Sequence, residues 1–308
     1  MAFLGNDAVN RVNLHTGIQA LAQAGGGVFF LVFLLRAGVP IPVALLAQAA
    51  IMAVRLVIRP IILPLVKRWG IKPLLIAGTL GMGLQYPVLA QVHGVGPGLL
   101  TLCAVAAVAD VFYWPAYHAY FAAIGDAHHR GHQVSARDAM VSVAGIVAPL
   151  MGGWALVTFG PGRMFAAVGL IQALAAVPLF GAPNVAVRAS APGTLRAARL
   201  ATILAVADGW LAAWFIVVWQ IALFVSLGSS FTAYGGAMAL AALAGAVGGM
   251  LLGRHIDGGG GQRAVAIAML AVAAVLLLRA VSLGSPWLAV AANALGAPAY
   301  SLLSPTLG

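Results

Sequence analysis

Four charged side chains lie inside long apolar stretches of the sequence, and they are the residues best suited to chemistry. They are Arg55, Arg59, Asp110 and Asp208. An aspartate in such surroundings can take up and release a proton, and an arginine can pair with it or hold an anion. A charge in hydrocarbon costs about 2.5 to 3.5 kcal/mol, so we expect these residues to have partners and a function.

Arg55 and Asp110 are the expected partners. Each lies about twelve residues from the start of its apolar stretch, which at 1.5 Å per residue places both about 18 Å along a helix. Three interpretations stay open. The two residues form a pair that only fixes helix packing, they form a pair in which Asp110 also exchanges a proton, or they do not meet.

Asp110 also begins an aromatic face. The pattern at i, i+4, i+7, i+8 and i+11 is typical of one side of a helix, and it comprises Asp110, Trp114, Tyr117, His118 and Phe121. A later stretch carries a second acid with two tryptophans, Asp208, Trp210 and Trp214. Tryptophan is also common at the membrane interface, so binding and lipid-belt roles stay equally open for Trp114 and Trp210. An acid among tryptophans suits an amphiphilic or cationic organic molecule.

A metal site is a second possibility for chemistry. His128 and His132 lie four residues apart and could share a divalent ion, although a solvated loop is the ordinary explanation. The single cysteine, Cys103, excludes a disulfide framework. The sequence has no Gly-x-x-x-x-Gly-Lys-Ser/Thr loop, so we expect no ATP hydrolysis. We also expect no bound metal and no cofactor.

The composition shows which elements must position these residues. Of 308 residues, 63% are apolar and 7% charged, against about 45 to 50% and about 25% in soluble domains. This balance excludes a soluble protein and predicts an all-α polytopic membrane protein. The net charge of +10 comes from 16 basic and 6 acidic residues. Because the basic residues are scattered between apolar stretches, we expect no nucleic-acid partner.

Ten apolar stretches are each long enough to cross a bilayer, for which a helix needs about 20 residues. They cover residues 14–36, 43–63, 73–92, 98–121, 138–159, 163–182, 200–227, 231–252, 264–282 and 286–306. Most basic residues fall in the connections after even-numbered stretches, whereas the other connections hold only Arg36, Arg163 and Arg279. This bias predicts a cytoplasmic N-terminus in a multi-pass protein of the cell (inner) membrane.

An internal repeat divides the chain. Residues 109–117 and 292–300 share an alanine, a Pro-Ala-Tyr sequence and an Asp/Asn pair at a constant offset, since 292 − 109 = 183. Duplicated helix bundles are common in transporters. The repeat therefore predicts a six-helix bundle over 1–183, a cytoplasmic linker over 184–199 and a second bundle over 200–308. That second bundle would have four helices of an expected six.

With this layout the sequence resembles the major facilitator superfamily, whose members have two six-helix bundles around a central cavity. In the family's loop between helices 2 and 3, the positions of Arg68, Gly70 and Lys72 fit the motif, whereas Pro64 and Lys67 replace its Gly and Asp. The corresponding second-half loop keeps Gly253 and Asp257. The resemblance implies that these loops control the conformational change, with Asp257 carrying any latch.

The fifth stretch is similar to the family's antiporter motif, with Gly145 and Pro149 in place and Ala148 where a Gly is usual. Two interpretations of this motif are equally open: it indicates an antiporter, or it only allows close helix packing. In the family, helices 1, 4, 7 and 10 line the cavity. This implies that the polar lining includes Gln19 and Gln23 on the first helix and Asn293 on the tenth, beside the acidic and aromatic faces already described.

The resemblance implies a secondary active transporter, not an enzyme, that moves a small organic solute by alternating access. We expect proton coupling through Asp110 or Asp208, efflux rather than uptake, and a monomer without the family's last two helices. The competing hypothesis is a membrane sensor, or a membrane-embedded enzyme that uses His128 and His132.

Overall fold

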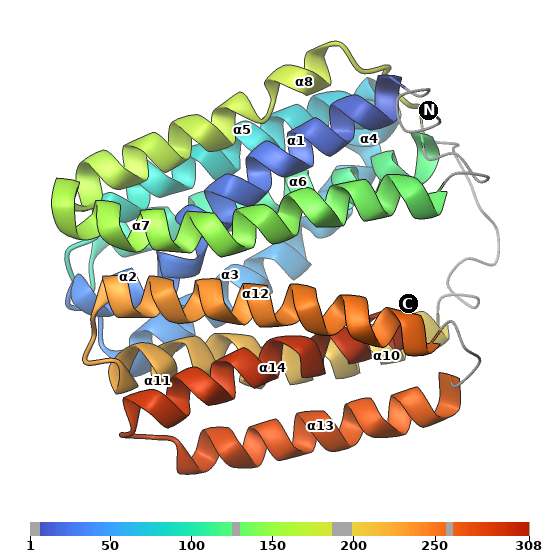
Figure 1. The fold of residues 1–308 in the computed structure, drawn as a ribbon. Coiled ribbons are helices and arrows are strands. Elements are labelled where there is room, and N and C mark those ends of the chain that lie inside the picture. The colour runs from blue at the N-terminus through green and yellow to red at the C-terminus, as the bar shows by residue number, and fades with distance from the viewer. Residues whose placement is uncertain (1–6, 125–129, 187–198, 257–260, 308) are drawn as a thin grey trace. The chain divides into compact units, whose positions relative to one another are not determined.

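The computed structural model describes residues 7–124, 130–186, 199–256 and 261–307 (Figure 1). Helices account for 89% of the chain, and the described residues contain no strand. The all-α prediction is therefore confirmed. Contacts divide the chain into two compact units, Met1–Ala144 with Ala155–Ala191 and Gly145–Trp154 with Pro192–Gly308.

By length and composition, seven helices within the described residues can cross a membrane. They cover Asp7–Arg36, Ile41–Trp69, Ile71–Ala90, Pro97–Ile124, Arg137–Phe180, Gly209–Ser226 and Phe231–Gly248. The expected count of ten, divided six and four, is not confirmed by this result. One reason is that the fifth of these helices covers two predicted spans, which are two helices joined at Gly160, where φ is 79° and ψ is 164°.

The first unit consists of helices, two of which are interrupted by short 3₁₀ turns. The helices are α1 (Asp7–Gly25), α2 (Phe30–Arg36), α3 (Ile41–Ile58), α4 (Ile62–Trp69), α5 (Ile71–Ala90), α6 (Pro97–Ile124), α7 (Arg130–Leu174) and α8 (Val177–Phe180). Residues Gly145–Trp154 of α7 belong to the second unit. Short 3₁₀ turns, η2 (Gly27–Phe29) and η3 (Arg59–Ile61), separate α1 from α2 and α3 from α4. Pro60 lies in η3, where its missing N–H interrupts the α-helical hydrogen bonds.

Helix α6 is the central helix of the first unit, since it packs against α5, α3 and α1. The contact with α5 is so close that a Cβ atom on Gly78 would lie 2.5 Å from the Tyr113 backbone nitrogen. Only glycine allows this approach. Tyr113 and Tyr120 are completely buried beside α5, so the α6 residues that could do chemistry stand on a firmly packed helix.

The second unit repeats this arrangement. Its helices are α10 (Arg199–Ala212), the π-helix η4 (Ala213–Val218), α11 (Trp219–Ser226), α12 (Phe231–Ile256), α13 (Gly261–Val281) and α14 (Pro286–Leu307). Helix α14 is central here, because it packs against α12, α13 and α11, and Figure 1 shows it between neighbouring helices of its unit. Helices α6 and α14 carry the two copies of the repeated sequence, so the contacts agree with a duplication.

Candidate functional site

An ion pair between α3 and α6 forms the centre of the candidate site. Arg55 Nη1 lies 3.1 Å from Asp110 Oδ2 and 3.2 Å from the Met52 sulfur. Arg55 is fourteen residues from the start of α3 and Asp110 thirteen from the start of α6, which is about 20 Å along each helix. The structure thus brings together the two charges that the sequence places at equal depth.

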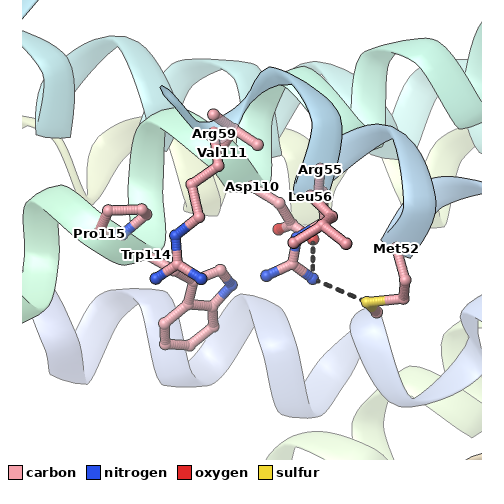
Figure 2. Close-up of a pocket in the computed structure, with 8 residues that line it drawn as sticks. All are labelled: Met52, Arg55, Leu56, Arg59, Asp110, Val111, Trp114 and Pro115. Atoms are coloured by element: carbon pink, nitrogen blue, oxygen red, sulfur yellow. Dashed lines mark hydrogen bonds and ion pairs between the residues drawn. The ribbon is translucent and has the colours of Figure 1, made fainter. Parts of the chain in front are cut away.

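The ion pair lines a cavity of about 200 Å³ between the two helices (Figure 2). The cavity residues are Met52, Arg55, Leu56, Arg59, Asp110, Val111, Trp114 and Pro115. The side chains of Arg55 and Asp110 are 27% and 17% exposed, so water reaches the pair only in part. Pro115 has no N–H to donate to the Val111 carbonyl, so α6 lacks one backbone hydrogen bond beside this cavity.

Arg59 belongs to the cavity although the sequence suggested no partner for it. It lies in η3, the turn that Pro60 creates, and Figure 2 shows its guanidinium beside the Trp114 ring. Two arginines and one ionised aspartate give this cavity a net charge of +1. A proton on Asp110 would raise that charge to +2 and release Arg55 from its partner.

The aromatic face of α6 divides between the cavity and the protein interior. Trp114 lines the cavity, and the exposed His118 ring stacks on it at 5.9 Å. Tyr117, by contrast, is 6% exposed and its hydroxyl lies 3.1 Å from Thr16 Oγ1 of α1. Phe121 stacks on Tyr117 at 6.3 Å. Of the predicted binding face, only Asp110 and Trp114 line this cavity.

Sequence reasoning missed a buried histidine of α1. His15 is 0% exposed, and its Nδ1 lies 2.7 Å from the Ala175 carbonyl oxygen, to which it donates. Its Nε2 lies 3.0 Å from the Tyr113 hydroxyl and in the neutral ring accepts the hydroxyl hydrogen. The only available signal was a single histidine inside an apolar stretch. This network joins α1 to the same helix that carries Asp110.

The two predicted glutamines of α1 differ in burial. Gln19 is 6% exposed and Gln23 is partly buried. Neither of them lines the Asp110 cavity. In this unit, the acidic part of the site and the predicted polar lining are therefore not the same set of residues.

Asn293 of α14 lines a second cavity, of about 280 Å³, within the second unit. It is 7% exposed, accepts a hydrogen bond from Trp219 Nε1 at 3.0 Å, and donates one to the Ala237 carbonyl at 3.0 Å. Trp210 and Trp214 are 73% and 57% exposed and are not lining residues of this cavity. Asp208 lies in α10, and its side chain falls outside the described part.

The sequence of residues 16–308 matches the family described as the Major Facilitator Superfamily. The chain belongs to the Major Facilitator Superfamily. The resemblance expected from the loop motifs and the repeat is therefore confirmed. Membership supports a secondary transporter rather than an enzyme in a multi-pass membrane protein.

Solved structures share this fold at low sequence identity. A mutant of peptide transporter POT in complex with sulfate has a TM-score of 0.67 at 15% identity, with 99% of this chain and 82% of that chain covered. A complex of a POT mutant with alafosfalin has a TM-score of 0.65 at 14% identity over the same shares. At these identities the likeness shows the superfamily fold alone. No curated protein matches the chain.

The superfamily loop motif of the first unit holds the end of α8 in place. Gly70 has φ of 82°, a backbone conformation that favours glycine. The Lys72 Nζ atom donates to the carbonyl oxygens of Phe180 at 3.2 Å and Ala182 at 2.8 Å. Asn184 Nδ2 donates to the Trp69 carbonyl oxygen at 2.8 Å. Arg68 is exposed, so Gly70 and Lys72 are the motif residues that make this contact.

The remaining superfamily positions are on α7 and α12. Pro149 is buried in α7 and Gly145 is partly buried there. Gly253 lies near the end of α12. Asp257 and His128 lie outside the described residues, and for His132 only its place in α7 is described. Within the described part, no three His, Cys, Asp or Glu side chains gather as metal ligands.

Proposed function

We propose that this protein moves a small amphiphilic organic solute across the cell membrane by alternating access, in exchange for protons and in the direction of efflux. The observation that carries the proposal is the Arg55–Asp110 ion pair, 3.1 Å long, which lines a cavity at the middle of two apolar helices. Charged side chains at this depth are costly, and those that occur in membrane helices usually have a function.

The coupling of transport to protons would depend on competition between Arg55 and a proton for the Asp110 carboxylate. When Asp110 is ionised it holds Arg55 and so joins α6 to α3. When a proton binds, the carboxylate becomes neutral and the pair loses its electrostatic attraction. A proton that is bound more tightly in one conformation than in the other shifts the equilibrium between them. Asp208 on α10 is the second residue that we propose for coupling.

Several further features belong to the same proposal. The N-terminus is cytoplasmic, ten helices cross the membrane, and residues 1–183 and 200–308 form two bundles joined by a cytoplasmic linker over 184–199. The protein acts as a monomer. The POT structures, whose titles name a peptide transporter, give the fold in which such a cycle can operate.

The first experiment is to find a solute and measure its flux. A panel of amphiphilic solutes is tested for thermal stabilisation of the purified protein, and the best one is loaded into proteoliposomes. We expect a pH step to drive solute movement in the wild type and in Asp138→Asn, a control whose side chain is 57% exposed. We expect no proton-driven movement in Asp110→Asn.

Two outcomes would contradict the proposal. Full proton-driven flux in both Asp110→Asn and Asp208→Asn would show that neither carboxylate couples transport to protons. Stabilisation by a solute without any flux, in the wild type and in the control alike, would favour the membrane sensor instead.

A further inference from the structure

An arginine in the second unit directs its charge into the protein. Arg279 lies two residues before the end of α13, where arginines usually extend toward the membrane surface. Instead its side chain is 7% exposed and Nη1 donates to the Phe215 carbonyl oxygen at 2.6 Å. The guanidinium also contacts Gly296, which is ten residues, or about 15 Å, from the start of α14.

Aromatic rings hold the positive charge of Arg279, and no acidic side chain pairs with it among the residues that the structure describes. Its Cζ atom lies 3.8 Å from the ring centre of Phe215 and 4.5 Å from that of Trp219, so two aromatic faces stabilise the cation. Nε is buried and has no hydrogen-bond partner within the described residues.

Phe215, which receives this arginine, lies in the π-helix η4. In a π-helix the hydrogen bonds run from i to i+5, and single turns of this kind are frequent at functional sites. The Phe215 carbonyl oxygen in η4 points to Arg279 Nη1. The local helix geometry and the buried cation therefore occur together.

Arg279 lines the cavity of about 280 Å³ that also contains Asn293. The other lining residues are mostly apolar and comprise Phe215, Ile216, Trp219, Gln220, Met238, Ala241, Gly296 and Ala297. Asn293 is already engaged by Trp219 and the Ala237 carbonyl oxygen. The guanidinium is thus the only charged group among the residues that line this cavity, and most of the others are apolar.

The repeat shows that this cavity is the counterpart of the Asp110 cavity. With the offset of 183, Arg55 corresponds to Met238, since 55 + 183 = 238, and Asp110 corresponds to Asn293, since 110 + 183 = 293. Each of these four residues lines the cavity of its own unit. The second cavity has neither an aspartate nor an arginine at these two positions, and its cation, Arg279, comes from α13.

We propose that the Arg279 cavity binds the carboxylate of a small organic anion with an apolar body. A guanidinium presents its N–H groups in a planar fork that matches a carboxylate, and the apolar lining accommodates the rest of the molecule. The proposal rests on the proposed function only where it identifies this anion as the transported solute. Binding itself needs no transport.

The test measures binding to the purified full chain by calorimetry and thermal stabilisation. The probes are benzoate, its neutral analogue benzamide, its cationic analogue benzylammonium, and chloride. We expect benzoate to bind at least tenfold more tightly than each of the others. Chloride binding as tight as that of benzoate would overturn the carboxylate class, and benzamide binding as tight would overturn the role of charge.

Two variants locate the site. Arg279→Gln removes the charge, and we expect it to weaken benzoate binding at least tenfold. Gly296→Ala keeps the charge but adds a Cβ that would lie 2.5 Å from Arg279 Nη2, so it must displace the guanidinium, and it remains informative if Arg279→Gln does not fold. Arg163→Gln, at an exposed arginine, is the control. Unchanged benzoate affinity in Gly296→Ala would refute the site. Tight benzoate binding without benzoate flux would leave the site standing and refute the identification of this anion as the transported solute.

Discussion

The ion pair of the first unit can be replaced by the two uncharged residue types that occupy the corresponding positions of the second unit. Arg55→Met and Asp110→Asn together would place in α3 and α6 the residue types found at Met238 and Asn293. In the second unit, Asn293 Nδ2 lies 4.0 Å from the Met238 sulfur, so the two types fit side by side between equivalent helices. The single variants instead leave one charge without its partner.

The expected magnitudes follow from the burial of the pair. Removing one partner costs about 3 to 5 kcal/mol in a buried pair and about 0 to 1 kcal/mol in an exposed one. Because Arg55 and Asp110 are 27% and 17% exposed, we expect about 2 kcal/mol for each single variant. The double variant leaves no unpaired charge and should lie within about 1 kcal/mol of the wild type. The coupling energy, which is the sum of the two single losses minus the loss in the double variant, is then about 3 to 5 kcal/mol.

The assay is the free energy of unfolding, measured by sodium dodecyl sulfate titration in mixed micelles and followed by circular dichroism. Arg137→Met and Asp138→Asn provide the matched control, because this neighbouring pair has an Nη2 to Oδ1 distance of 2.9 Å but a 57% exposed carboxylate. Its coupling should stay below about 1 kcal/mol. If the losses of unfolding free energy in Arg55→Met and Asp110→Asn simply add up in the double variant, the contact between α3 and α6 is not electrostatic and this reasoning is refuted.

Three further predictions concern the packing around the site, each checked by the same unfolding measurement. Gly78→Ala should destabilise the protein by about 1 to 3 kcal/mol because its Cβ would meet the α6 backbone, whereas Gly96→Ala, with open space around it, should change stability by less than about 0.5 kcal/mol; equal effects would contradict the close approach. His15→Ala should cost about 2 to 3 kcal/mol through two lost buried hydrogen bonds, and the exposed His93→Ala should be nearly neutral. Lys72→Met should cost about 1 kcal/mol by freeing two carbonyl oxygens, and an unchanged stability would show that this contact does not hold α8.

The sequence predicted the helical class and the Arg55 and Asp110 pair because both follow from composition and depth. Charges are rare in apolar stretches, and two of opposite sign at equal depth have few other partners. The roles of Tyr117 and Arg279 could not be obtained in this way. Periodicity placed Tyr117 on the same side of α6 as Asp110. That side of the helix is wide, so Asp110 lines the cavity while Tyr117 contacts Thr16 of α1. In the sequence, Arg279 lies near a helix end and only contributes to the prediction of membrane orientation. Its inward direction depends on contacts with α14 and η4, which the sequence does not show.

The cluster around His15 shows a second limit. A single histidine gives no periodic signal, and its partners Tyr113 and Ala175 lie 98 and 160 residues away. Only the packing of α1 against α6 and α8 brings them together. Long-range contacts of this kind determine which polar residues face a cavity and which stay buried.

The most direct test of the central claim is to record protons and solute in the same vesicles. Proteoliposomes containing a pH-sensitive dye receive an inward gradient of the stabilising solute with the membrane potential clamped at zero. Exchange for protons predicts that the lumen becomes more alkaline as the solute enters, and that Asp110→Asn abolishes this change while Asp138→Asn does not. Solute entry in the wild type without any change in luminal pH would contradict the account.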